Sequence, residues 1–122
     1  MADRSERNKA ILNQFAVMEE RITELENEIR QSDDEILKEL FAIEKECLTK
    51  KLQQIQSAVM RLDNVHERRM IWLHYIGEIN NGKRVRLKIW QIANRMNYSF
   101  DWAKKVNASA IKNLNFDKKD TK

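Results

Sequence analysis

Apolar residues at an unbroken heptad spacing near the start of the chain constrain the fold most strongly. Successive members alternate between four and three residues apart, which places all of them on one face of an α-helix. They are Ile11, Phe15, Met18, Ile22, Leu25 and Ile29. The residues between them are rich in Glu and Arg, as suits a helix with its other faces in water. We therefore predict a helix over residues 5–31 whose apolar seam packs against another helix.

This register ends at residues 32–35, where Ser32 and Glu35 have the spacing of a capping box. A tight helical hairpin is favoured here, and one continuous rod with a stutter is the alternative. The second helix, over about 34–61, carries two apolar stripes offset by one residue. The first stripe is Ile36, Leu40, Ile43 and Cys47, and the second is Leu48, Leu52, Ile55, Val59 and Leu62. We predict that this helix packs antiparallel on the first.

A second helical signal lies near the C-terminus, where small Ala93 precedes Asn97 by four residues. Asn tolerates the left-handed conformation of a sharp turn, and Ser99 offers a hydroxyl that caps the next helix. The spacing predicts a helix-turn-helix made of helices over 87–97 and 99–115. A plain helical hairpin in a small bundle is the alternative. Upstream, Asn64 and Glu67 have capping-box spacing and predict a third helix over about 65–76.

The second helix of this motif is predicted to have a buried face and an exposed face. Trp90, from the helix before it, is expected to fill the core. The residues expected to face inward are Trp102, Ala103, Val106, Ala110, Ile111 and Leu114. The candidate DNA contacts near its N-terminal end are Ser99, Phe100, Asp101, Lys104, Lys105 and Ala108. A recognition helix contacts base edges at this end.

Five residues of this helix have a side-chain chemistry that suits DNA. Lys104 and Lys105 suit guanine or phosphate. Asp101 can accept a hydrogen bond from cytosine N4, and Phe100 suits a thymine methyl group. Lys112, further along the helix, is better placed for a phosphate.

Residues 77–86 contain both glycines of the chain and the strong turn signal Asn81-Gly82. An irregular loop is expected, and a short β-hairpin that pairs Ile79 with Val85 is the alternative. Four cations lie within six positions of this segment and its end: Lys83, Arg84, Arg86 and Lys88. They are candidate contacts to the DNA backbone, where neutralised phosphates release counterions. A solvated loop without that role is the alternative.

Composition supports an all-α fold with a coiled-coil part, because proline is absent and 34% of residues are charged. Residues 1–62 hold 10 Lys and Arg against 13 Asp and Glu, and residues 63–122 hold 13 against 6. The net charges are therefore −3 and +7, so the part with the helix-turn-helix is the one suited to phosphates. No apolar run approaches the roughly 18 residues of a membrane span, and no secretion signal is expected.

Catalysis is not expected, because the sequence lacks a nucleophile beside a base, a phosphate-cradling glycine loop and a cluster of metal ligands. His66 and His74 lie eight residues apart, which does not suit a helical metal site. No cofactor is therefore expected. Cys47, the single cysteine, suits a reducing cytoplasm and is predicted to be a small packed residue.

Residues between about 62 and 114 resemble a known family. The positions that carry the resemblance are Leu62, Arg68, Met70, Ile71, Leu73, Tyr75, Ile76, Ile92, Ala93, Met96, Tyr98, Ser99, Val106, Ala110, Ile111 and Leu114. They are similar to the C-terminal half of small phage transcriptional regulators of the RinA/ArpU type, which resemble region 4 of sigma factors. The resemblance implies sequence-specific binding at a phage promoter and contact with RNA polymerase.

The leading hypothesis is a phage-type transcriptional regulator that acts in the cytoplasm of a bacterial host. Residues 63–122 would bind double-stranded DNA, and the hairpin of residues 1–62 would form a dimer through residues 5–61 or hold a partner. One alternative is a helical phage protein that inhibits a host or defence protein. The other is a DNA-packaging subunit similar to a small terminase, because those subunits also join a helix-turn-helix to an oligomerisation hairpin.

Overall fold

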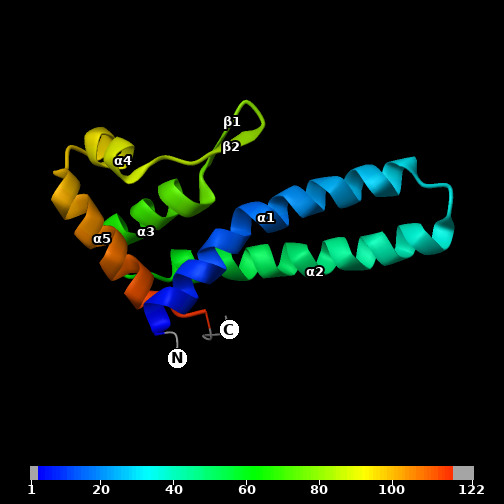
Figure 1. The fold of residues 1–122 in the computed structure, drawn as a ribbon, viewed down its shortest axis with the longest axis horizontal. Helices are drawn as coiled ribbons and strands as arrows, with labels where there is room; N and C mark the ends of the chain where they lie inside the picture. The colour runs from blue at the N-terminus through cyan, green and yellow to red at the C-terminus, as the bar shows by residue number, and fades with distance from the viewer. Residues whose placement is uncertain (1–2, 117–122) are drawn as a thin grey trace.

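The computed structural model describes residues 3–116, and residues 117–122 of the predicted DNA-binding domain lie outside that range. Two long helices come first, α1 (Arg4–Gln31) and α2 (Glu35–Met60). The short helix α3 (Val65–Ile71) continues directly as the π-helical turn η1 (Trp72–Ile76). The strands β1 (Glu78–Asn80) and β2 (Lys83–Val85) precede α4 (Ile89–Met96) and α5 (Phe100–Asn113). The fold is all-α apart from this small β-hairpin, as predicted (Figure 1).

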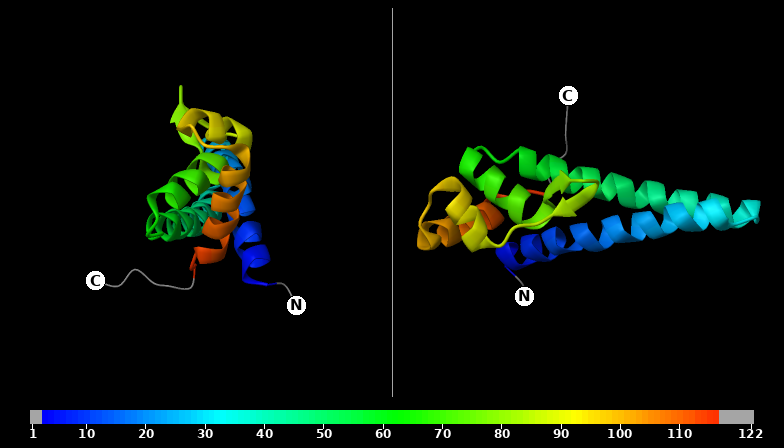
Figure 2. Two further views of the ribbon diagram at one scale, coloured as in Figure 1. Left: turned by 90° about the vertical axis from the view of Figure 1, so that its left-hand side faces the viewer. Right: turned by 90° about the horizontal axis from the view of Figure 1, so that it is seen from above.

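The helices α1 and α2 form a long antiparallel hairpin that projects from the rest of the molecule (Figures 1 and 2). The predicted hairpin is confirmed, and the continuous rod is not observed. The capping prediction is wrong, because Ser32 ends α1 and the chain reverses over residues 32–34. Asp34 caps α2 instead, and its carboxylate accepts hydrogen bonds from the backbone N–H groups of Ile36 (2.9 Å) and Leu37 (3.3 Å).

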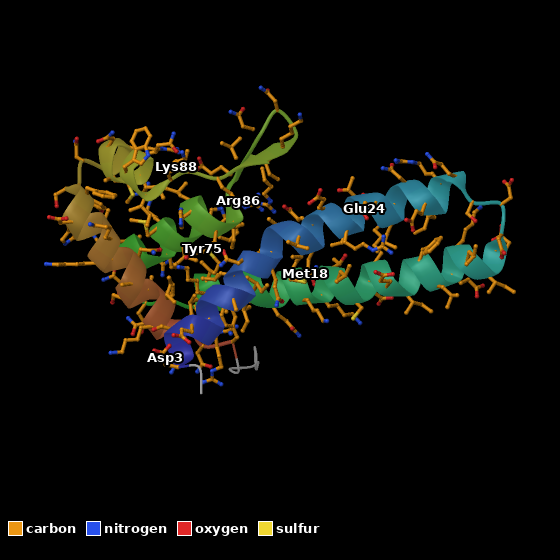
Figure 3. The ribbon with its side chains drawn as sticks, in the orientation of Figure 1. Asp3, Met18, Glu24, Tyr75, Arg86 and Lys88 are labelled. Carbon is orange, nitrogen blue, oxygen red and sulfur yellow. The ribbon has the colours of Figure 1, made fainter. Side chains whose placement is uncertain are left out.

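The two helices of the hairpin pack along the predicted seam of α1. Phe15 and Leu25 are fully buried, and Met18 lies between the two helices (Figure 3). On α2, the second stripe is buried from Leu52 onward, whereas the first stripe points away from α1. Cys47 is exposed, so its predicted packing is wrong. A helix can turn only one of two offset stripes toward its neighbour, and the second stripe continues into the main core.

The core consists of two clusters that α5 connects. The first joins the base of the hairpin to η1 and to the C-terminal half of α5. Its largest fully buried members are Leu12, Phe15, Val59, Ile71, Ile76 and Leu114. The second cluster lies inside the C-terminal helices and contains Met70, Leu73, Ile92, Ala93 and Ala103. Because one helix contributes to both clusters, the hairpin and the helix-turn-helix share a continuous packed structure.

Residues 78–85 form a β-hairpin, so the expected irregular loop is wrong. Asn81 (φ 53°) and Gly82 (φ 78°) both adopt positive φ, as a two-residue turn that matches the twist of paired strands requires. This turn sets Asn80 opposite Lys83 and therefore Ile79 opposite Arg84. The predicted pairing of Ile79 with Val85 is off by one residue for the same reason.

Two tryptophans lie further outside than predicted. Trp90 is 51% exposed and Trp102 is 39% exposed. The short helix α4 turns Ile92 and Ala93 inward, and at 3.6 residues per turn Trp90 then lies on a different side of the helix. Trp102 lies at the edge of the buried face of α5, which contains Ala103, Ala110 and Ile111. Neither tryptophan fills the core.

Candidate nucleic-acid interface

The turn between α4 and α5 has the local chemistry that the sequence predicts. Asn97 ends α4 in the left-handed conformation (φ 59°, ψ 39°). The next backbone N–H, of Tyr98, donates to the carbonyl oxygen of Ala93 at 2.8 Å. The Ser99 hydroxyl then accepts a hydrogen bond from the backbone N–H of Trp102 at 3.1 Å and caps α5. These contacts fix the direction in which α5 leaves the turn (Figure 1).

The outward face of α5, which we define as Phe100, Asp101, Lys104, Lys105, Ala108 and Lys112, is exposed along its length. The opposite side of the helix is buried at Ala103 and Ala110. The predicted division of this helix into a buried and an exposed side is therefore present, and every candidate contact on it is accessible to solvent.

Lys104 is the one lysine of this face with close contacts among the described residues. Its ammonium nitrogen lies 3.5 Å from an Asp101 carboxylate oxygen and 4.6 Å from the centre of the Phe100 ring. An exposed ion pair of this kind contributes about 0–1 kcal/mol, so an incoming phosphate can replace it. Lys105 and Lys112 make no ion pair or side-chain hydrogen bond within residues 3–116.

An aromatic cluster that was not predicted from the sequence lies beside the first turn of α5. The rings of Tyr98 and Trp102 are 3.9 Å apart between centroids, and His66 of α3 lies 5.6 Å from Trp102. The Tyr98 hydroxyl also hydrogen-bonds Nδ1 of His66. The signal in the sequence is the spacing of four residues between Tyr98 and Trp102, across the cap. The cluster links α3 to the turn and holds the N-terminal end of α5.

Two of the four clustered cations serve the fold. Arg84 Nε lies 2.8 Å from a carboxylate oxygen of Glu19 on α1, and Arg86 Nη2 lies 3.4 Å from the other oxygen. Arg86 also donates to the backbone carbonyl of Tyr75 at 2.8 Å (Figure 3). Both side chains are largely buried by these contacts. They attach the β-hairpin to α1 and η1, which leaves them poorly placed to bind phosphate.

Lys83 and Lys88 are exposed and make no side-chain ion pair with a described residue. Lys83 lies at the start of β2, beside the tight turn. Lys88 immediately precedes α4 (Figure 3), and its backbone N–H donates a hydrogen bond to Oε1 of Gln91 at 2.8 Å. The two lysines are therefore the members of the predicted basic loop that remain available to a phosphate.

A basic cleft of about 360 Å³ borders the turn of the helix-turn-helix. Arg69 lines it and makes no side-chain hydrogen bond or ion pair among the described residues. Arg68 donates to the carbonyl oxygen of Leu62 at 2.8 Å. Arg95 pairs with Glu78 at 2.9 Å, with both side chains about half exposed. The cleft therefore places arginines of α3 and α4 beside the turn that precedes α5.

Within residues 3–116, no group of three or more His, Cys, Asp or Glu side chains is placed to hold a metal ion. The same part of the chain contains no helix long and apolar enough to span a bilayer. Comparisons with protein-family models, with curated proteins and with solved structures found no match to this chain.

Proposed function

We propose that this protein binds double-stranded DNA through the outward face of α5 and acts as a phage-type transcriptional regulator. One observation carries the proposal. The helix that follows the left-handed turn buries its inner side in both core clusters and exposes three lysines, Lys104, Lys105 and Lys112, on its outer side. An α-helix about 10–12 Å across fits a major groove about 12 Å wide.

The arrangement along α5 suits a helix that enters a groove with its N-terminal end first. Lys104 and Lys105 lie in its second turn, within reach of base edges or the nearest phosphates. Ala108, one turn further, presents a methyl group that permits close approach and can contact a thymine methyl. Lys112 lies roughly 10 Å beyond Lys105 at ~1.5 Å per residue, where the helix meets the DNA backbone. Lys83, Lys88 and Arg69 would add phosphate contacts outside the groove.

Salt dependence of binding tests this assignment. Lys104→Ala with Lys105→Ala removes two cations from the outward face of α5. The matched control is Lys50→Ala with Lys51→Ala, which removes two exposed lysines from α2. Fluorescence anisotropy with a labelled mixed-sequence duplex, at 50 to 200 mM salt, measures the affinity of each variant. The logarithm of the binding constant falls as the logarithm of the salt concentration rises. Each lost phosphate contact reduces the magnitude of this negative slope by about 0.9.

We expect the slope of the α5 double variant to be shallower than that of the wild type by about 1.8, and the slope of the α2 control to equal that of the wild type. Equal slopes in the two double variants would remove α5 from the interface. Selection of bound duplexes from a random pool then tests specificity. Enrichment of a common sequence supports a regulator, whereas binding without enrichment contradicts that part of the proposal.

We also propose that the protein binds DNA as a dimer. Pairing through residues 5–61, on a surface other than the exposed apolar side of α2, would present two α5 helices to half-sites about 34–36 Å apart, or a multiple of that distance. Light scattering of the free protein and of the complex measures the subunit count. A ring of eight or more subunits would instead favour the packaging alternative.

A further inference from the structure

The outer side of the hairpin carries an apolar surface that no part of residues 3–116 covers. We call Ile36, Leu40, Ile43 and Cys47 the outer stripe; the three large aliphatic side chains are 71%, 56% and 65% exposed. Side chains on this side of α2 project away from α1 (Figure 3). Their spacing of four, three and four residues is that of a seam between two packed helices. Large contiguous apolar patches on a protein surface commonly mark interaction sites.

Acidic residues border the outer stripe. At 3.6 residues per turn, Glu39 and Glu46 lie along one edge, and Glu44 lies along the other. Glu39 has no ion-pair partner among the described residues, and Glu46 has a partner in exposed Lys50 (3.3 Å). Residues 22–47 as a whole contain nine Asp and Glu against three Lys and Arg, which is a net charge of −6.

The charges along the two edges of the outer stripe determine which helices could bind there. Any apolar helix gains by burying the same side chains, so the difference in affinity between candidates depends on their flanking charges. A second copy of α2 in antiparallel contact would set Glu39 against Glu46 of the other copy. In parallel contact, heptad geometry would set Glu39 against Glu44. Glu44 is ion-paired with Arg21 at 2.9 Å, so the local repulsion is greatest in the antiparallel arrangement. Both arrangements bring together two hairpins that each carry a net charge of −6 over residues 22–47.

We propose that the outer stripe is the docking surface for a basic amphipathic α-helix of a different protein. That helix would place apolar residues at i, i+4, i+7 and i+11 over the stripe, and Lys or Arg side chains opposite Glu39 and Glu46. The contact region spans residues 36–47, or roughly 18 Å at ~1.5 Å per residue. The surface is separate from the outward face of α5, so the inference does not depend on DNA binding.

Two synthetic helical peptides of equal length test the proposal. Both carry Leu and Ile at the same heptad positions, and their flanking positions hold Lys in one peptide and Glu in the other. Anisotropy of the labelled peptides is measured with the full chain at 50 and 500 mM salt. We expect the Lys peptide to bind about tenfold tighter at low salt. This preference should shrink at high salt, because exposed charges are then screened.

Variants identify the surface. Leu40→Gln with Ile43→Gln should abolish binding, whereas Ile79→Gln, at an exposed aliphatic residue of the β-hairpin, should leave it unchanged. Glu39→Lys with Glu46→Lys should reverse the preference toward the Glu peptide. All of these side chains are exposed, and circular dichroism checks that each variant is folded.

Three results would overturn the proposal. Equal binding of the two peptides at low salt would show that the edges do not select the partner. Binding that persists in the Leu40 and Ile43 variant would place the peptide elsewhere. A dimer of the free protein that becomes a monomer in that variant would show that a second copy occupies the stripe.

Discussion

Asn8 of α1 is predicted to be one of the most important polar residues for stability. Its buried side-chain amide donates to the backbone carbonyls of Ile111 (2.7 Å) and Leu114 (3.0 Å) at the end of α5. Carbonyls in the last turn of a helix lack partners further along the chain. Each such hydrogen bond contributes about 1 kcal/mol net. The two hydrogen bonds should therefore contribute about 2 kcal/mol, although the Leu114 carbonyl also accepts from Arg4 Nη2 at 2.6 Å. Because Asn8→Ala also gains roughly 0.6 kcal/mol of helix propensity, its net cost should be about 1.4 kcal/mol.

Asn13, which is exposed on the same helix, provides the matched control. Asn→Ala raises helix propensity at either position by roughly 0.6 kcal/mol, so the difference between Asn8→Ala and Asn13→Ala isolates the contact with α5. Urea unfolding followed by circular dichroism measures both free energies of unfolding. At roughly 2.1 cal/mol/K per residue, a difference of about 2 kcal/mol corresponds to about 8 °C in Tm. A difference below about 0.5 kcal/mol would show that water replaces the amide without cost.

Two further predictions concern the β-hairpin and the ion pairs of the long hairpin. A Cβ on Gly77 (φ +89°) would lie 2.8 Å from the carbonyl oxygen of Val85, whereas one on Gly82 (φ +78°) meets open space. Urea unfolding should show a cost of about 1 kcal/mol for Gly82→Ala and about 3 kcal/mol for Gly77→Ala; equal costs would contradict the steric argument. A hydrogen bond from Arg21 lowers the pKa of the Glu44 carboxyl below its ordinary value of 4.5. The ion pair therefore stabilises the folded protein above about pH 4.5, and this stabilisation is lost as the pH falls through the pKa of Glu44 in the folded state. Between pH 5 and pH 3, Tm should therefore fall further for the wild type than for Glu44→Gln, and equal falls measured by circular dichroism would contradict this.

Helical periodicity was sufficient to predict the long helices and the turn of the helix-turn-helix. Their signals are local: a seam of apolar residues, an Asn that tolerates positive φ, and a Ser at the cap. Asn97 and Ser99 have the predicted roles, because a turn of this kind depends on the residues within it. The exposure of Lys104, Lys105 and Lys112 on α5 also followed from the spacing alone.

The choice between the two stripes of α2 could not be made from α2 itself. Both stripes have helical spacing, and Ile43 is as apolar as Ile55. The side that is buried is determined by the base of the hairpin, where Leu12 and Leu114 from distant parts of the chain complete the cluster. The roles of Arg84 and Arg86 were equally inaccessible, because their shared partner Glu19 lies more than 60 residues away in the sequence.

The separation of charge along the molecule makes an acidic hairpin compatible with DNA binding. Leu40, in the outer stripe, precedes the end of α2 at Met60 by 20 residues, or roughly 30 Å at ~1.5 Å per residue. The first turn of α5 lies at the opposite end of the molecule from the hairpin tip (Figure 1). The Debye length is about 8 Å at physiological salt, so the acidic tip is more than three such lengths from DNA at α5. Its repulsion of phosphates would therefore be largely screened, and the shared core would hold the proposed helix partner and the proposed DNA duplex at one fixed geometry.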